Sequence, residues 1–279
     1  MPDVTVITGG AGGMGLAAAK IVGGDHPVVI CDVSQDRLGA AVAALGEADV
    51  ECTAVVCDIT DQNSVAELVE ASSAVGPVAS VIHTAGLSPS MGSADLIMRV
   101  NAVGTVNINE AFLPLAHAGF AIVNVASMAA HMLPQKVIPT DSFGYALENQ
   151  DVFMEKMMSA CNVAPDEARP GLSYSLSKSF VVWYCKSQAP RFGSRGARVV
   201  SVSPGSIDTP MGRLEEQSGA GAMIDFAALK RFGKPEEIAE LLAFCAGEKA
   251  GYLSGADILC DGGVVAGMTL RDKLSVRRN

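Results

Sequence analysis

A tyrosine and a lysine placed four residues apart are the side chains in this sequence best suited to acid–base chemistry. They are Tyr174 and Lys178, in the segment Ser-Tyr-Ser-Leu-Ser-Lys. Residues four apart on a helix project from the same face, so the phenol and the ammonium would lie close together. A free tyrosine has a pKa near ~10, and a nearby positive charge lowers it. Such a pair could exchange a proton with the hydroxyl or carbonyl group of a substrate.

Two polar residues earlier in the chain could complete this site. Ser127 follows the apolar run Ala121–Val125, and its hydroxyl could hold an oxygen on which negative charge changes during a reaction. Asn101 lies in a segment that we expect to be helical, where a buried amide could bind water and link Lys178 to solvent. Each residue taken alone could equally be a turn or capping residue. Their occurrence together favours a catalytic set of Asn101, Ser127, Tyr174 and Lys178.

A glycine-rich segment, Thr8–Gly15, joins a predicted strand to a predicted helix. Two registers of a dinucleotide-binding motif fit it: G-x-G-x-x-G at Gly10, Gly12 and Gly15, and T-G-x-x-x-G-x-G at Gly9, Gly13 and Gly15. Glycines let the backbone turn tightly, and the helix N-terminus then presents N–H groups and a positive dipole end to an anion. Because the segment stands between a strand and a helix, we interpret it as a pyrophosphate-binding loop rather than a simple turn.

Two aspartates end the next two predicted strands. Asp32 could accept hydrogen bonds from adenosine ribose hydroxyls and would repel a 2′-phosphate, so it favours NAD over NADP. The glycine-rich segment contains no Arg or Lys that would offset this repulsion. Asp32 could instead cap the following helix, although Ser34 is better placed to do so. Asp58 could reach the adenine amino group, or could simply be a turn or helix-start residue.

The elements that must position these residues alternate regularly along the chain. Of the 279 residues, 49% are hydrophobic, and short apolar runs alternate with helix-length amphipathic segments. The predicted strands are Val4–Ile7, Val28–Cys31, Thr53–Cys57, Ala79–Ile82, Ala121–Val125, Arg198–Val202 and Ala256–Cys260. This pattern predicts an α/β fold, a single doubly wound (Rossmann) domain with a seven-stranded parallel sheet covered on both faces. We assign it to residues 1–270, with an insertion at about 129–171 between strand 5 and the catalytic helix.

Charge and cysteine content limit the classes of partner and compartment. The net charge of −10 disfavours nucleic acid and anionic membranes as partners. The exception is the basic C-terminal tail, 271–279, which could be solvated or could fold onto an acidic neighbouring subunit. The seven cysteines form no C-x-x-C pair, and no apolar run approaches the ~20 residues of a membrane span. We therefore expect a cytoplasmic protein with reduced thiols and no metal site.

The order of these motifs resembles that of the short-chain dehydrogenase/reductase family, from Thr8-Gly9 to Asp261-Gly262-Gly263. The resemblance implies that Tyr174 is the catalytic acid/base and that Lys178 binds the nicotinamide ribose and lowers the tyrosine pKa. It also implies that Ser127 orients the substrate and that Asn101 completes a tetrad. Together with the motifs, it places the cofactor contacts at Gly9, Gly12, Gly13, Met14, Gly15, Asp32, Asp58, Ile59, Ala85, Gly86, Tyr174, Lys178, Ile207 and Thr209.

Two features depart from the family pattern. The family usually has N-N-A-G after its fourth strand, whereas this chain has His83-Thr84-Ala85-Gly86. We interpret His83 as a hydrogen-bonded core histidine rather than a proton carrier. The family also usually places its serine about a dozen residues before its tyrosine, whereas 47 positions separate Ser127 from Tyr174 here. Some bacterial hydroxysteroid dehydrogenase/carbonyl reductase members look similar, with an insertion at this point.

The insertion contains a helical stretch near Asn149–Cys161 with one apolar face. The residues of that face are Val152, Phe153, Met154, Met157 and Met158. Three interpretations are open: local core, part of a substrate lid, or a cover over the helix surface that the family often uses to form tetramers. The same alternatives leave the expected assembly open between a homodimer and a homotetramer.

A second apolar segment follows Pro210 and could close over a substrate beside the nicotinamide. Its apolar residues are Met211, Leu214, Met223, Ile224 and Phe226. This lining favours a hydrophobic secondary alcohol or ketone, such as a steroid, terpenoid or cyclic alcohol. The sequence thus predicts an NAD-dependent oxidoreductase of such substrates. The alternatives are a 3-oxoacyl-thioester reductase, which would be expected to use NADP, and a non-catalytic dinucleotide-sensing protein.

Overall fold

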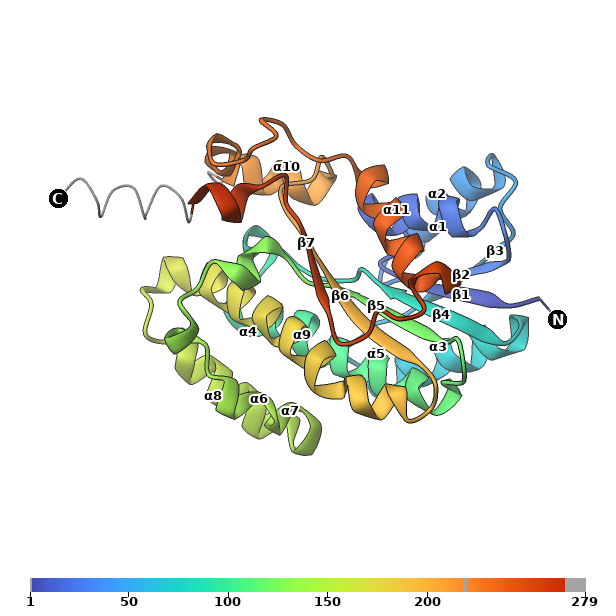
Figure 1. Cartoon of the computed structure of the whole chain (residues 1–279), viewed down its shortest axis with the longest axis horizontal. Helices are drawn as coiled ribbons and strands as arrows, with labels where there is room; N and C mark the ends of the chain where they lie inside the picture. Colours follow the sequence, from blue (N-terminus) through green and yellow to red (C-terminus); the bar gives the residue numbers. More distant parts are fainter. Residues whose placement is uncertain (1, 218–219, 269–279) are drawn as a thin grey trace.

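Seven parallel strands form one twisted sheet in the computed structural model, which describes residues 2–217 and 220–268 (Figure 1). The strands are β1 Val4–Thr8, β2 Val28–Asp32, β3 Cys52–Val56, β4 Val78–His83, β5 Ala121–Val125, β6 Arg198–Pro204 and β7 Asp257–Cys260. Their order is β3-β2-β1-β4-β5-β6-β7. The predicted doubly wound α/β fold is therefore confirmed. Because the strand order reverses between β1 and β4, the carboxyl ends of these two strands flank the crevice where such folds bind ligands.

Helices cover both faces of the sheet, as Figure 1 shows. One face packs against α1 Gly13–Val22, α2 Gln35–Gly46 and α11 Pro235–Ala246. The other packs against α3 Gln62–Val75, α4 Ala94–Met98, α5 Gly104–Phe112 and α9 Arg169–Gly193. Side chains alternate between the faces along each strand, so Ile7 and Val200 join one core and Val6 and Val199 join the other.

The outermost strands are less covered than the sequence pattern predicts. Val56 of β3 is 46% exposed and Leu259 of β7 is 39% exposed, although both lie in apolar runs. The inner strands β1, β5 and β6, by contrast, are buried throughout, and β2 and β4 each have one partly exposed residue. The expectation of full cover therefore holds for the centre of the sheet and fails at its edges, where each strand has only one neighbour.

Residues 129–171, the predicted insertion, are all described; they form helices on the outer side of α9 and contain no strand (Figure 1). Its elements are the 3₁₀ helices η4 Met128–His131, η5 Gln135–Val137 and η6 Asp166–Ala168, and the helices α6 Thr140–Phe143, α7 Tyr145–Glu148 and α8 Gln150–Cys161. Asn149 caps α8 by accepting hydrogen bonds from the backbone N–H groups of Asp151 and Val152.

The apolar face of α8 packs against α4 and α9 as part of the main core. Phe153, Met154 and Met157 are buried in that core. Phe143 of α6 meets Phe180 of α9 edge to face, with 5.3 Å between ring centroids. Among the three interpretations of this face, local core describes what these side chains do.

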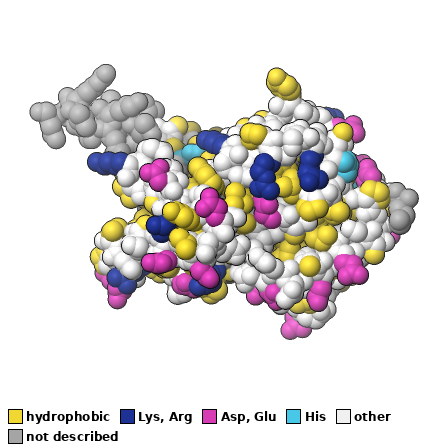
Figure 2. Space-filling model, turned by 90° about the horizontal axis from the view of Figure 1, so that it is seen from below, with side chains coloured by type: hydrophobic (Ala, Val, Ile, Leu, Met, Phe, Trp, Pro, Cys, Tyr) yellow, Lys and Arg dark blue, Asp and Glu magenta, His cyan; other side chains and the backbone are white. Residues whose placement is uncertain are grey.

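The outer surface around the insertion is mixed in character. Figure 2 views the molecule from this side and shows hydrophobic and acidic side chains intermingled, without a continuous basic area. An open groove of about 560 Å³ lies between α3, α5 and the α7–α8 junction, and none of the predicted site residues lines it. No helix among the described residues is long and apolar enough to span a membrane. The basic tail 271–279 lies outside the described residues.

Candidate active site

The glycine loop is shaped by steric requirements at four positions, Gly9, Gly10, Gly13 and Gly15. Gly9 and Gly13 have positive φ angles of 65° and 51°, which favour glycine. A Cβ atom at Gly9 would lie 2.8 Å from the backbone nitrogen of Ala85, and one at Gly15 would press on the carbonyl oxygen of Gly9. A Cβ atom at Gly10 would lie 2.7 Å from Ile30 Cβ. Each glycine of the register Gly9, Gly13 and Gly15 is therefore restricted by its φ angle or its neighbours, whereas the other register includes the unrestricted Gly12. Gly12 is extended and caps α1, and no described atom lies within 4 Å of the position of its missing Cβ.

The start of α1 fits the pyrophosphate of a dinucleotide. The first N–H groups of a helix have no partner within the helix, and they carry its positive dipole end. The first turn of α1 contains no acidic side chain that would repel an anion. A Cβ atom at Gly13 would lie 3.3 Å from the Thr209 side chain, so the loop after β6 faces the glycine loop. The structure thus brings Gly9, Gly13, Ala85 and Thr209 together around one crevice.

Asp32 ends β2 beside this crevice and already has two partners. Its Oδ1 accepts hydrogen bonds from the backbone N–H of Ser34, at 3.0 Å, and from Nη2 of Arg37, at 2.5 Å. Ser34 rather than Asp32 caps α2, by accepting a hydrogen bond from the Arg37 N–H. Arg37 was missed in the sequence because it lies outside the glycine loop, five positions after Asp32. The glycine loop itself carries no cation, but Arg37 outside it offsets part of the Asp32 charge.

Asp58 and Ile59 follow β3 but have different surroundings. The exposed Asp58 accepts hydrogen bonds at Oδ1 from the N–H and the hydroxyl of Thr60, at 2.9 and 2.7 Å. This is the turn role that the sequence left open, and an adenine contact stays a prediction. Ile59 is buried, and its side chain fills the space where Gly104 of α5 has no Cβ.

The predicted catalytic side chains converge at the carboxyl end of β5. Tyr174 and Lys178 lie one turn apart on α9, and Lys178 Nζ is 5.9 Å from the centroid of the Tyr174 ring. Lys178 Nζ donates a hydrogen bond of 2.9 Å to the carbonyl oxygen of Val125, the last residue of β5. Ser127 is close enough to Tyr174 for its hydroxyl to lower the pKa of the phenol. The serine and the tyrosine are therefore adjacent despite the insertion between them.

Asn101 stands beside Lys178, in the π-helical turn η2 Arg99–Val103. Its Oδ1 accepts a hydrogen bond from the Leu87 N–H, at 2.8 Å, and its Nδ2 donates to the Leu87 carbonyl, at 2.9 Å. A Cβ atom at Gly86 would lie 3.1 Å from Asn101 Oδ1 and 3.4 Å from Lys178 Nζ. Asn101 thus fixes the loop after β4 next to the Lys178 ammonium group. π-helical turns of this kind often occur at functional sites.

Burial dominates the electrostatics of the pair. It lowers the pKa of Lys178 from 10.5 to about 8, so the lysine remains charged at pH 7. Burial raises the pKa of Tyr174, the nearby Ser127 hydroxyl opposes this, and the charge of Glu215 adds to it. The expectation that Lys178 lowers the pKa of Tyr174 is therefore wrong for the chain's own groups. A lowered tyrosine pKa requires a further positive charge, such as that of an oxidised nicotinamide.

His83 is confirmed as a core histidine. It is buried, its Nδ1 is 2.7 Å from the Thr8 hydroxyl and its Nε2 is 3.1 Å from the Thr105 hydroxyl. Burial, with a smaller contribution from Lys178, lowers its pKa to about 3, which leaves it neutral. Thr84 donates a hydrogen bond of 2.7 Å to the Thr8 carbonyl. His83 and Thr84, which replace the family's usual asparagines, therefore both form hydrogen bonds with Thr8 and link the end of β4 to the end of β1.

The segment after β6 approaches the loop after β4. It contains α10 Pro210–Gln217, where Glu215 Oε1 accepts a hydrogen bond of 2.9 Å from the Ser90 N–H in η1 Pro89–Met91. No local pattern in the sequence indicates this contact, because 125 positions separate the two residues. Met211, Met223, Ile224 and Phe226 are partly buried in this region. Leu214 is 46% exposed, so the predicted apolar lining is incomplete.

Comparisons with known proteins agree with this geometry. The family model described as short chain dehydrogenase matches residues 3–139, and the model described as Enoyl-(Acyl carrier protein) reductase matches residues 152–265. A short-chain dehydrogenase/reductase of Alternaria brassicicola is 30% identical over 95% of this chain and 97% of its own. The (−)-isopiperitenol/(−)-carveol dehydrogenase of Mentha piperita is 28% identical over 94% and 92%. The solved structure of a short-chain dehydrogenase/reductase from Serratia marcescens is 25% identical, with a TM-score of 0.75 over 94% of this chain and 98% of that one.

These matches span both halves of the chain and leave residues 140–151 between them unmatched. The Alternaria relative covers nearly the full length of both proteins. The site places a serine, a tyrosine, a lysine and an asparagine beside a glycine loop suited to a dinucleotide. The chain belongs to the short-chain dehydrogenase/reductase family and is an NAD(P)-dependent oxidoreductase that acts on alcohols or ketones.

Proposed function

We propose that the protein prefers NAD(H) and interconverts a hydrophobic cyclic secondary alcohol and its ketone. The observation that carries the cofactor preference is the Asp32 carboxylate, 8% exposed at the end of β2, where an adenosine ribose would lie. Arg37 neutralises part of this charge. We therefore expect a preference of about tenfold, equivalent to about 1.4 kcal/mol, rather than exclusion of NADP.

The chain's own residues account for the proton transfer. The nicotinamide, when bound, would accept or supply the hydride, and Lys178 would hold its ribose. Asn101 fixes the loop after β4 beside that lysine. Ser127 donates a hydrogen bond to the substrate oxygen, which stabilises the negative charge that develops there. In oxidation Tyr174 accepts the proton of the substrate hydroxyl, and in reduction it returns a proton to the carbonyl oxygen.

The substrate class is supported by the region after β6. Its partly buried apolar side chains suit a hydrophobic ring, and the Mentha relative is named for cyclic terpenoid alcohols. Two arginines of this region are held in ion pairs, Arg213 with Asp208 at 2.8 Å and Arg231 with Glu237 at 2.7 Å. They are therefore engaged rather than presented to an anionic substrate. This disfavours the 3-oxoacyl-thioester alternative, whose carriers bear phosphate groups.

Two measurements test the proposal. NADH and NADPH are titrated against the protein by fluorescence, and NADH should bind about tenfold more tightly. Tighter binding of NADPH would contradict the argument from Asp32. Absorbance at 340 nm is then followed with (−)-carveol, cyclohexanol, a hydroxysteroid and a 3-oxoacyl thioester, each with both cofactors. Turnover of the thioester alone would replace the proposed substrate class.

The variant Tyr174→Phe separates binding from chemistry. It should bind NADH as tightly as the wild-type protein, because the phenol hydroxyl acts on the substrate, yet it should lose turnover. Retained turnover would remove Tyr174 from its assigned role. Binding of NADH without turnover of any substrate by the wild-type protein would instead favour the dinucleotide-sensing alternative.

A further inference from the structure

A belt of polar side chains crosses the sheet at one level. Each of five adjacent strands contributes one residue, and each residue is the register partner of the next. In strand order they are Thr8 of β1, His83 of β4, Asn124 of β5, Ser201 of β6 and Asp257 of β7. The belt ends on the edge strand β7, so Asp257 has a strand on one side only.

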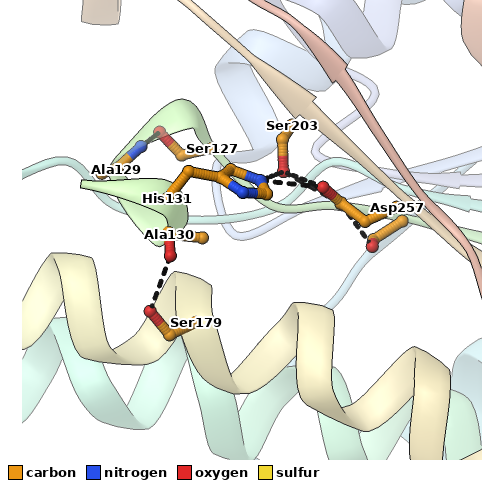
Figure 3. A network of polar contacts seen from close by, with 8 residues as sticks. Ser127, Ala129, Ala130, His131, Ser179, Ser203 and Asp257 are labelled. Carbon is orange, nitrogen blue, oxygen red and sulfur yellow. Dashed lines mark hydrogen bonds and ion pairs between the residues drawn. The ribbon is translucent and has the colours of Figure 1, made fainter. Parts of the chain in front are cut away.

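Asp257 is a buried carboxylate held by three side chains. Its side chain is 5% exposed. The Ser201 hydroxyl donates to it at 2.5 Å and the Ser203 hydroxyl at 2.9 Å. The third partner is His131, whose Nε2 is 2.9 Å from Asp257 Oδ2 (Figure 3). A buried carboxylate is costly unless it is hydrogen-bonded, so these donors favour one fixed position for it and for His131.

His131 ends the single turn that Ser127 begins. Ser127 caps this turn, η4, because its Oγ accepts a hydrogen bond from the Ala129 N–H at 3.2 Å. On the other side Ser179 of α9 donates to the Ala130 carbonyl at 3.3 Å. Figure 3 shows η4 held between α9 and the β6–β7 edge by these contacts. Displacement of the His131 end of so short a turn would therefore displace Ser127.

The length of the connection between Ser127 and Tyr174 explains why this attachment matters. A connection of about a dozen residues between the serine and the tyrosine would restrict the serine by its shortness. Here 47 positions separate Ser127 from Tyr174, and a longer connection restricts its ends less. His131 lies four positions after Ser127, where the chain leaves for the insertion. An attachment at His131 makes the position of Ser127 independent of movements in the longer segment that follows.

We propose that His131 and Asp257 are positioning residues that fix η4 to the edge of the sheet and so hold Ser127 against Tyr174. Neither residue is assigned a contact with the reacting atoms. This inference rests on the proposed role of Ser127 in the reaction. It adds a requirement that the family motif does not contain, namely an ionisable pair formed between the stem of the insertion and β7.

The test uses the full-length protein and the variants His131→Ala, His131→Gln and Asp257→Asn. Glutamine can place an amide N–H close to the position of the histidine Nε2, so it serves as the conservative replacement. His117→Ala is the matched control, since His117 is exposed and contacts the Ala118 carbonyl and the Phe120 ring, away from the pair. Oxidation of (−)-carveol with NAD gives kcat and KM. Hydrogen exchange of peptides spanning 128–132 reports on the turn in the protein without substrate.

We expect His131→Ala and Asp257→Asn to lower kcat about tenfold or more, because small misplacements of a catalytic group are costly. KM should stay within roughly twofold, since substrate binding does not depend on the pair. Exchange over 128–132 should accelerate in both variants. His131→Gln should recover kcat to within about threefold and restore slow exchange, and His117→Ala should match the wild-type protein.

Two results would overturn the proposal. One is exchange in His131→Ala as slow as in the wild-type protein. The other is a raised KM without recovery in His131→Gln, which would place His131 in contact with the substrate. If the wild-type protein does not oxidise (−)-carveol, the proposed function fails for that alcohol. The exchange measurement still decides the role of the pair, because it needs no substrate.

Discussion

Replacing Lys178 with methionine is expected to stabilise the protein at neutral pH while it abolishes turnover. The lysine is 6% exposed, and burial lowers its pKa from 10.5 to about 8. Each pKa unit corresponds to about 1.4 kcal/mol, so holding the buried ammonium costs about 3 kcal/mol at pH 7. Methionine avoids that cost but loses the hydrogen bond to the Val125 carbonyl, worth about 1 to 2 kcal/mol. The variant should therefore be more stable by about 1 to 2 kcal/mol at pH 7.

The pH dependence gives the sharper signature. Below pH 8 both the folded and the unfolded wild-type chains carry the charged lysine, and the full cost applies. Between about pH 8 and 10.5 the unfolded chain binds more protons than the folded one, so wild-type stability rises with pH relative to the variant. The advantage of Lys178→Met should thus shrink by about 3 kcal/mol across this range and change sign near its middle, at about pH 9.

Urea denaturation of both proteins between pH 7 and 10.5 measures this difference. Lys186→Met is the matched control, because Lys186 lies two turns further along α9 and is exposed. The control should differ from the wild-type protein by a nearly constant amount over the same range. A constant difference for Lys178→Met would refute the reasoning, since it would show that burial does not lower the lysine pKa.

Three further predictions concern the rest of the site. Glu215→Gln should move the pH–rate profile of alcohol oxidation to lower pH, because Glu215 raises the pKa of Tyr174; an unchanged profile would contradict this. Gly15→Ala should weaken NADH binding at least about tenfold by fluorescence titration, because the new methyl group would press on the Gly9 carbonyl. Light scattering should give a homodimer, because the insertion helices pack on the outer side of α9, a surface that tetramers of the family often use. A tetramer would contradict this prediction, because it would have to assemble through another surface.

Much of the site was predictable because its signals are local. The glycine loop requires positive φ angles at Gly9 and Gly13, and the presence of glycine at these positions indicates that requirement. Tyr174 and Lys178 share a face because helical periodicity sets their relation. The ends of parallel strands meet at one edge of the sheet, which places Asp32 and Ser127 near the same crevice. These inferences needed only the order of residues along short segments.

The residues that sequence reasoning missed act through space. Arg37 pairs with Asp32 because the first turn of α2 folds back over the end of β2. Glu215 reaches Ser90, and His131 reaches Asp257, across more than a hundred positions. The sequence around a charged residue does not identify its partner in space. Each of these residues was therefore compatible with an ordinary solvated surface position.

By itself, the sequence determined the alternation of strands and helices, the cofactor loop and the identity of the acid–base pair, because periodicity and backbone freedom are local properties. The tertiary structure decided the register that aligns Thr8, His83, Asn124, Ser201 and Asp257 across the sheet. It also decided that burial, rather than the neighbouring lysine, controls the pKa of Tyr174. Both depend on which segments pack together and how much water they exclude, and neither quantity exists until the chain has folded.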